Sequence, residues 1–268
     1  MLPPVRSPPA GRGAAEGASC MSGHNRWSKI KRKKEAQGAA KGKLFSKVIK
    51  EITVAARMGG GDPAGNPRLR AAIDAAKEAN MPQDNITRAV KKGTGELEGV
   101  SYEEVVYEGY GPAGVAMMVE CLTDNRNRTA GDVRSSFSKG GGNLAAEGAV
   151  AWNFEKRGVV EVRPGPTEDR VTEAAIEAGA EDVVSLGADG FEVRTHPNDL
   201  HAVAASLEKT LKLGARRITF VAKETVRLAD PDRARAVLKL VDALEDLEDV
   251  QSVHANFEID DKLMEQLA

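Results

Sequence analysis

The sequence predicts an α+β protein of three domains: an N-terminal all-α domain at residues 22–98, followed by two α/β domains. Three observations support this prediction. At 268 residues the chain exceeds the usual size of one domain. Before Gly99, apolar residues recur at the three-to-four spacing of helices, and after it strand-like runs alternate with helical segments. Between residues 158 and 223 the expected order is βαββαβ, the ferredoxin-like arrangement.

Three helices are expected in the all-α domain, separated by segments rich in glycine and proline. Asn66 is placed to cap the second helix, with Pro67 at its first position, a favoured combination. Gly93 is expected to close the third helix. The expected ranges are 31–58, 67–79 and 83–92, the last beginning at Gln83 or Asp84.

The middle domain is expected to be discontinuous. A last helix and strand have no partners in the βαββαβ unit, and they could complete an earlier strand-helix-strand set. This makes 99–157 plus 224–268 one domain, with 158–223 inserted into it. Its expected strands are 105–107, 115–122, 149–154 and 250–256, and its helices 128–138 and 231–247. The inserted unit has expected strands at 159–162, 182–186, 191–194 and 217–221 and helices at 168–178 and 198–213.

Residues 1–21 are expected to form a disordered leader, because they are rich in Pro, Gly and Ala and lack the apolar run of a secretory signal. An organellar transit peptide or an upstream start, with Met21 opening the folded protein, are the alternatives. No run approaches the ~20 apolar residues that span a bilayer, so no membrane association is expected. Cys20 and Cys121 are far apart and show no CxxC spacing, which argues against zinc and against a secreted disulfide framework. A cytoplasmic protein without metal or cofactor is expected.

The main functional observation is the distribution of charge. The formal net charge is −2, yet residues 22–50 carry ten Lys/Arg against one acid, which leaves residues 99–268 strongly acidic. One-sided basic charge with an interleaved aromatic suits a phosphate backbone. A solvated helix face, the alternative, normally mixes signs. The candidate nucleic-acid-binding residues here are His24, Arg26, Trp27, Lys29, Lys31, Arg32, Lys33, Lys34, Lys41 and Lys43.

A second candidate contact lies at the start of the helix expected at 128–138. Arg126 and Arg128 there oppose the helix macrodipole, which makes sense if they help backbone N–H groups to hold an anion. The alternative is that either arginine pairs with Glu120, Asp124 or Asp132. Lys139, just beyond this helix, could follow a nucleic-acid backbone, and an ordinary C-terminal cap is the simpler interpretation.

No catalytic constellation can be assembled from the spacing of the residues, so neither an enzyme nor a small-molecule substrate is expected. Gly109–Gly114 matches GxGxxG, but Pro112 lies inside it and a strand follows, which indicates a tight turn between strands. The acidic cluster at 245–249 could hold a metal, and a solvated helix end is its ordinary interpretation.

Several segments resemble the YebC family, bacterial proteins called transcriptional regulators, whose mitochondrial member is the translational activator of cytochrome oxidase. The resemblance covers the chain from Met21 onward and leaves the leader outside. The matching segments are Gly23–Ser28, Gly59–Pro63, Asn66–Arg70, Tyr107–Pro112, Glu120–Thr129, Ser138–Leu144 and Glu177–Asp182.

This resemblance implies a three-domain α plus α/β fold around a cleft and a non-enzymatic regulator of gene expression. A monomer is expected. One interpretation is a DNA-binding transcriptional regulator, as the family name indicates. The alternative is a ribosome- or ribosomal-RNA-associated translation factor that relieves stalling at difficult sequences such as proline runs. No helix-turn-helix is evident in the sequence, and a Lys-rich segment with glycines suits irregular ribosomal RNA.

Overall fold

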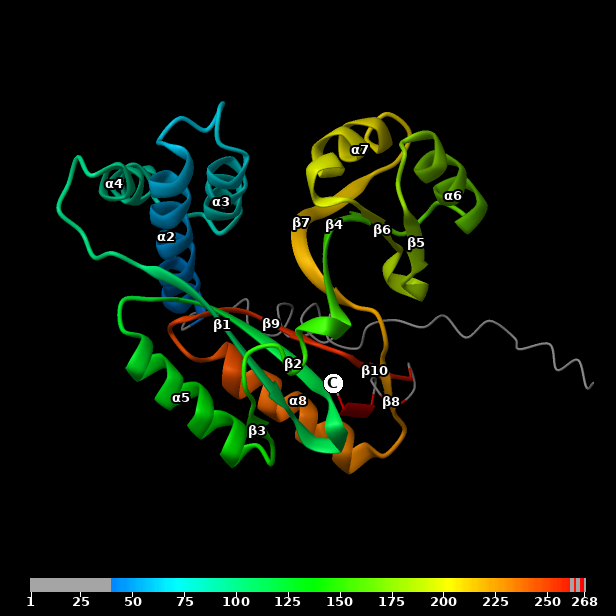
Figure 1. Ribbon diagram of the computed structural model, residues 1–268. Coiled ribbons are helices and arrows are strands. Elements are labelled where there is room, and N and C mark those ends of the chain that lie inside the picture. The colour runs from blue at the N-terminus through cyan, green and yellow to red at the C-terminus, as the bar shows by residue number, and fades with distance from the viewer. Residues whose placement is uncertain (1–39, 261–262, 264–265, 268) are drawn as a thin grey trace, which may run out of the picture.

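The computed structural model describes residues 40–260, 263, 266 and 267. As predicted, the protein combines helices and sheets: a helical N-terminal region precedes two sheet-containing domains (Figure 1). The leader at 1–21 and most of the basic segment lie outside the described residues.

The helical region consists of α2 (Ala40–Gly59), α3 (Pro67–Glu78) and α4 (Gln83–Thr94). Asn66 begins α3 as predicted, since its side-chain oxygen accepts a hydrogen bond from the Leu69 N–H at 3.0 Å. Its amide also donates to the carbonyl of Ala55 at 2.8 Å, which ties the start of α3 to α2. Buried aliphatic side chains from all three helices form the core of this region.

The prediction that Gly93 closes the third helix is wrong. The helix α4 continues to Thr94, and Gly95 at φ +83° caps it. Gly93 serves the packing of α4 on α2 instead. A Cβ at this position would lie 2.4 Å from the Thr53 carbonyl oxygen and 2.7 Å from the Ala56 Cβ.

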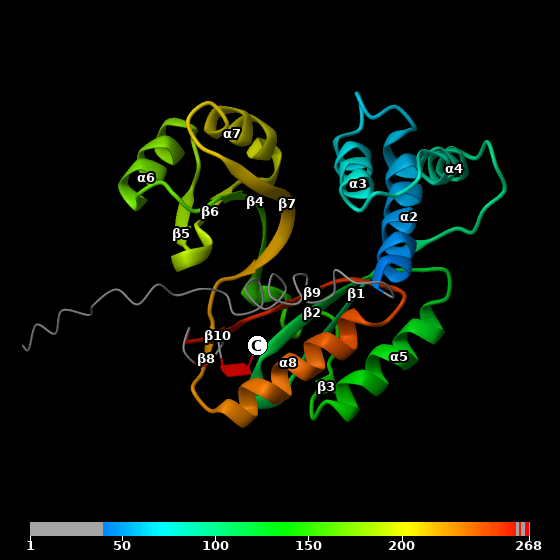
Figure 2. The same cartoon turned by 180° about the vertical axis from the view of Figure 1, so that it is seen from behind.

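The first sheet has the order β3-β1-β2-β9, and helices α5 and α8 cover one of its faces (Figures 1 and 2). A buried aliphatic core with Phe137 fills the space between them. The strands β1 and β2 form an antiparallel hairpin through the Gly109–Gly114 motif, which confirms the predicted turn. The ranges are β1 Glu103–Tyr110, β2 Ala116–Thr123, α5 Arg126–Lys139, β3 Asn143–Leu144, α8 Pro231–Glu245 and β9 Val250–Ala255.

The strand β9 returns from the far end of the chain to pair antiparallel with β2. It also approaches the second sheet, because His254 Nδ1 lies 3.3 Å from Thr219 Oγ1. The Nε2 of the same ring lies 2.7 Å from Glu120 Oε2 of β2. A separate two-stranded sheet pairs β8 (Val226–Leu228) in parallel with β10 (Phe257–Ile259).

The second sheet has the order β5-β6-β4-β7, and neighbouring strands are antiparallel. Read from β7, this places the unit's fourth, first, third and second strands side by side, with α6 and α7 packed on the sheet, so the ferredoxin-like arrangement is confirmed. The ranges are β4 Phe154–Val162, α6 Glu168–Glu177, β5 Asp182–Ser185, β6 Phe191–Thr195, α7 Leu200–Leu207 and β7 Leu213–Ala222. Short 3-10 turns lie at Pro112–Gly114, Ala151–Asn153, Gly187–Asp189 and Pro197–Asp199.

The strand expected at 149–154 is not formed. The carboxylate of Glu108, itself buried, accepts hydrogen bonds from the N–H groups of Gly148, Val150 and Ala151 at 2.7–2.8 Å. These backbone groups are therefore not available to a sheet. The strand β4 begins at Phe154, so the expected boundary at 157/158 falls inside it. The division into 22–98, 99–157 with 224–268, and 158–223 stays a prediction.

Candidate nucleic-acid interface

The structure describes only part of the predicted interface. Lys43, Arg126, Arg128 and Lys139 lie within it. Outside the described residues lie the predicted contacts that precede α2, together with the side chain of Lys41. These contacts are His24, Arg26, Trp27, Lys29, Lys31, Arg32, Lys33 and Lys34.

Three lysines of α2 contact the acidic turn at 245–249, which joins α8 to β9. Lys43 Nζ lies 3.4 Å from the carboxylate of Asp246, with both side chains 61% exposed. Lys47 Nζ donates to the Glu245 carbonyl at 2.7 Å, and Lys50 Nζ donates to the Glu248 carbonyl at 3.2 Å. Ammonium groups are favourable there because the carbonyls at a helix C-terminus carry partial negative charge. The last lysines of the basic segment therefore attach the helical region to the first sheet.

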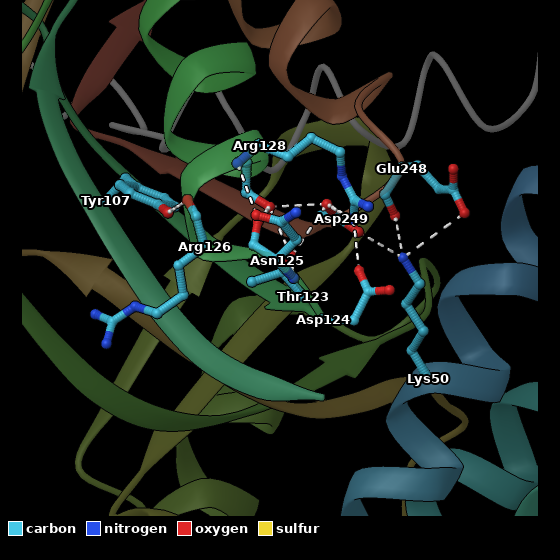
Figure 3. A network of polar contacts seen from close by, with 10 residues as sticks. Lys50, Tyr107, Thr123, Asp124, Asn125, Arg126, Arg128, Glu248 and Asp249 are labelled. Carbon is cyan, nitrogen blue, oxygen red and sulfur yellow. Dashed lines mark hydrogen bonds and ion pairs between the residues drawn. The ribbon is translucent and has the colours of Figure 1, made fainter. Parts of the chain in front are cut away.

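Asp249 is the centre of this joint (Figure 3). Its buried carboxylate accepts hydrogen bonds from Lys50 Nζ at 2.7 Å, Arg128 Nη2 at 2.7 Å and Thr129 Oγ1 at 2.8 Å. Burial alone raises the pKa of Asp249, but the hydrogen bonds from Lys50, Arg128 and Thr129 outweigh it and lower this pKa to about 2. Asp249 is therefore ionised near neutral pH and holds α2 and α5 to the start of β9.

The two arginines at the start of α5 occupy different environments (Figure 3). The guanidinium of Arg128 bonds both Asp124 and Asp249 at 2.7 Å, so the ion pair with Asp124 that was left open as an alternative is present. The Arg126 side chain points away from this network and is 67% exposed, and its ion pair with Glu103 is long at 3.9 Å. The structure therefore brings Arg128 into the joint and leaves Arg126 accessible to a partner.

Lys139 is not brought together with Arg126. It is the exposed last residue of α5, and Arg126 is the first. A 14-residue helix is about 20 Å long, so the two cations lie at opposite ends. A backbone cap follows Lys139, where the Gly140 N–H donates to the Ser136 carbonyl.

Sequence reasoning missed a third group of cations, on α4. Arg88, Lys91 and Lys92 are exposed and follow the i, i+3, i+4 spacing of one helix face. The connection from α3 to α4 takes only residues 79–82, with Asn80 in the left-handed region at φ 58°. This short turn joins α3 to α4, and each of the two helices packs on α2. The spacing of the three cations was the available signal.

The acidic cluster at 245–249 is not the solvated helix end that was expected. Asp249 is buried, and lysines of α2 form ion pairs with the cluster. Across the described residues, no three His, Cys, Asp or Glu side chains are grouped to hold a metal. Cys121 is a buried residue of β2, within the strand predicted at 115–122, and burial, together with the nearby Asp249, raises its pKa to about 12. No described helix is both long and apolar enough to cross a membrane.

These features define a three-part α+β protein in which ion pairs fix a basic helical region to a body of two sheets. The chain belongs to the TACO1/YebC family. Residues 25–96 match the TACO1/YebC protein N-terminal domain, and residues 102–257 match the TACO1/YebC second and third domain. The family resemblance of the sequence is confirmed.

Relatives at high identity cover nearly the same span. The chain is 64% identical over 248 residues to a protein of Myxococcus xanthus (strain DK1622), covering 92% of this chain and 99% of that one. It is 54% identical to a protein of Geobacter sulfurreducens, covering 92% of this chain and 100% of that one. Both are named probable transcriptional regulatory protein. Among solved structures it is similar to the conserved hypothetical protein Aq1575 from Aquifex aeolicus, with a TM-score of 0.75 and 52% identity, over 82% of this chain and 91% of that one.

Proposed function

We propose that this protein is a non-enzymatic, nucleic-acid-binding regulator of gene expression that acts as a monomer in the cytoplasm. The names of its relatives support regulation. The observation that supports nucleic-acid binding is the position at which the basic segment joins the rest of the protein. It enters α2 at Ala40, and Figures 1 and 2 both place the start of α2 beside the N-terminal end of α5, where Arg126 is exposed.

The charges divide into two groups with different tasks. Of the ten Lys/Arg in residues 22–50, Lys43, Lys47 and Lys50 contact the acidic turn at 245–249. The other seven precede them and remain the candidates for phosphate contact, together with Arg126. Neutralising phosphates with such cations releases counterions, so binding should weaken steeply as salt rises.

Duplex DNA is one candidate target. Arg88, Lys91 and Lys92 are exposed on one face of α4, where they can contact phosphates. Ribosomal RNA is the alternative target, because a basic segment with glycines can follow irregular backbones.

Crosslinking the intact protein in cells and sequencing the attached DNA and RNA tests the proposal. Enrichment of DNA or RNA over a matched strain without crosslinking supports it, and enrichment of neither contradicts it. Co-sedimentation with ribosomes at moderate salt, combined with a small preference for any duplex sequence, identifies the ribosomal target. A thousandfold preference for one promoter without ribosome binding identifies the transcriptional target.

A further inference from the structure

Trp152 is an exposed aromatic side chain that the interface described above does not use. Its side chain is 60% exposed, although tryptophan is among the costliest residues to leave in water. It lies in the 3-10 turn Ala151–Asn153, which leads from the first sheet into β4.

The backbone on both sides of Trp152 is firmly held. Before it, the buried carboxylate of Glu108 accepts hydrogen bonds from Val150 and Ala151 N–H groups, and the Val150 side chain is fully buried. After it, the buried side chain of Asn153 donates to the Glu224 carbonyl at 2.9 Å and accepts from the Glu224 N–H at 2.8 Å. Trp152 is therefore presented to solvent on a fixed support, which lowers the entropy lost on binding.

The indole has no polar group left to satisfy. Its Nε1–H donates to the Ala149 carbonyl at 3.0 Å, the same carbonyl that accepts the Tyr110 hydroxyl at 2.9 Å. A partner of Trp152 needs no hydrogen-bond acceptor at that point, so it recognises a flat aromatic surface. Planar π-systems stack well on such a surface.

Lys156 follows Trp152 by four residues, and Lys223 is bonded to the residue after Trp152. Lys156 is exposed at the start of β4, with its Nζ 5.8 Å from the Phe220 ring centroid and its charge acting on the carboxylate of Glu120. The Lys223 N–H donates to the Asn153 carbonyl at 2.8 Å, next to Trp152. The acid between them, Glu155, is paired with Lys223 at 3.1 Å and with Arg157 at 2.6 Å. An exposed ring and an exposed lysine four residues apart supply a stacking surface and a cation, the two elements that bind single-stranded nucleic acid.

We propose that Trp152 stacks on an unpaired nucleobase, with Lys156 contacting the phosphate backbone of the same strand. This inference rests on the proposed function and adds to it a second contact, on the body of the protein. A docked protein would instead need a contiguous apolar patch, whereas the residues that flank Trp152 on both sides are either buried or small.

Fluorescence of the full chain tests this inference. In the Trp27→Phe variant, Trp152 is the one remaining tryptophan and Phe still supplies a ring at position 27. Titration with 12-nucleotide single-stranded RNA and DNA should quench this fluorescence, and a blunt duplex of the same sequence should quench it much less. In the otherwise unchanged chain, Trp152→Ala should weaken single-strand binding roughly 5- to 100-fold, and Trp152→Phe should retain most of it.

Ile176→Ala is the matched control, because Ile176 is an exposed apolar residue on α6, at 71% exposure, and should leave binding unchanged. Thermal melting checks that Trp152→Ala stays folded, and the quenching result is independent of that variant. Binding of single strands without quenching of Trp152 overturns this inference and leaves the proposed function standing. If the unmodified protein binds no nucleic acid, the proposed function fails as well.

Discussion

Lys50 and Asp249 form a buried ion pair, with Nζ and Oδ1 2.7 Å apart, although 199 residues separate them in the sequence. Their side chains are only 8% and 6% exposed. A buried charge that loses its partner is costly, so this pair forms only when α2 is docked against the turn between α8 and β9. The pair therefore specifies the orientation of the helical region on the first sheet.

Replacing Lys50 by Met should lower the free energy of unfolding by about 3 kcal/mol, because a buried carboxylate loses a partner. This loss of stability is at the low end of the range for buried ion pairs, because Arg128 still bonds Asp249. Lys43→Met is the control, because its pair with Asp246 is exposed and should contribute less than about 1 kcal/mol. Urea denaturation of both variants measures the difference, and equal losses would contradict the central role of Asp249.

Stability should fall in acid through Asp249. The pKa of this carboxyl is about 2 in the folded state against an ordinary value of 3.8, so it is depressed on folding. A depressed pKa stabilises the protein fully above about pH 4, and this contribution is lost as pH falls from there toward pH 2. The shift corresponds to about 2 kcal/mol.

The measurement is the free energy of unfolding between pH 2 and pH 7 for the unchanged protein and for Asp249→Asn. The unchanged protein should be the more stable above pH 4, and its advantage should shrink steadily below that. A constant difference across the whole range would show that Asp249 does not titrate in this way.

Arg126 and Arg128 should respond oppositely to substitution by Gln. Arg128→Gln should cost about 1–2 kcal/mol of stability, because its bonds to Asp124 and Asp249 are lost. Arg126→Gln should leave stability unchanged and weaken nucleic-acid binding, since its side chain is exposed. Melting curves and binding titrations on the same samples separate the two effects. If only Arg128→Gln weakened binding, and did so without loss of stability, the roles given to the two arginines would be reversed.

Replacing Lys31, Arg32, Lys33 and Lys34 together by Ala should weaken nucleic-acid binding and flatten its salt dependence. Each lost phosphate contact lowers the slope of log K against log salt by about 0.7–0.9. The circular dichroism spectrum should not change. Unchanged affinity at low salt would remove this run of cations from the interface.

The local parts of the fold were predictable from the sequence because local periodicity determines them. The spacing of apolar residues located the helices of the N-terminal region, and alternating short runs gave the ferredoxin-like order. The end of α4 was misplaced because Gly93 serves a contact with α2, and a glycine needed for close packing has the same letter as one that caps a helix. The strand expected at 149–154 failed because a side chain far away in sequence, Glu108, takes its backbone N–H groups.

Only those contacts of the candidate site that join residues close in sequence were predictable. Asp124 lies four residues before Arg128, just ahead of α5, so their pairing could be anticipated from the i, i+4 spacing. Asp249 lies 121 residues beyond Arg128, and no periodicity relates the two. Counting charges along the sequence identified a basic segment and an acidic remainder. It could not show that lysines of the basic segment contact acidic residues of the remainder.

The strand β9 gives the protein a distinctive order of assembly during synthesis. Asp249, just before β9, anchors the helical region, and His254 within it meets Thr219 of the second sheet. Both anchors are synthesised after the helical region, the strands β1 to β8 and the helix α8. A nascent chain can therefore form its helices and its ferredoxin-like unit early. The attachment of both to the first sheet has to wait until β9 is made. Until β9 is made, β2 exposes an unpaired edge, which is the part of this protein most prone to mispairing with other strands.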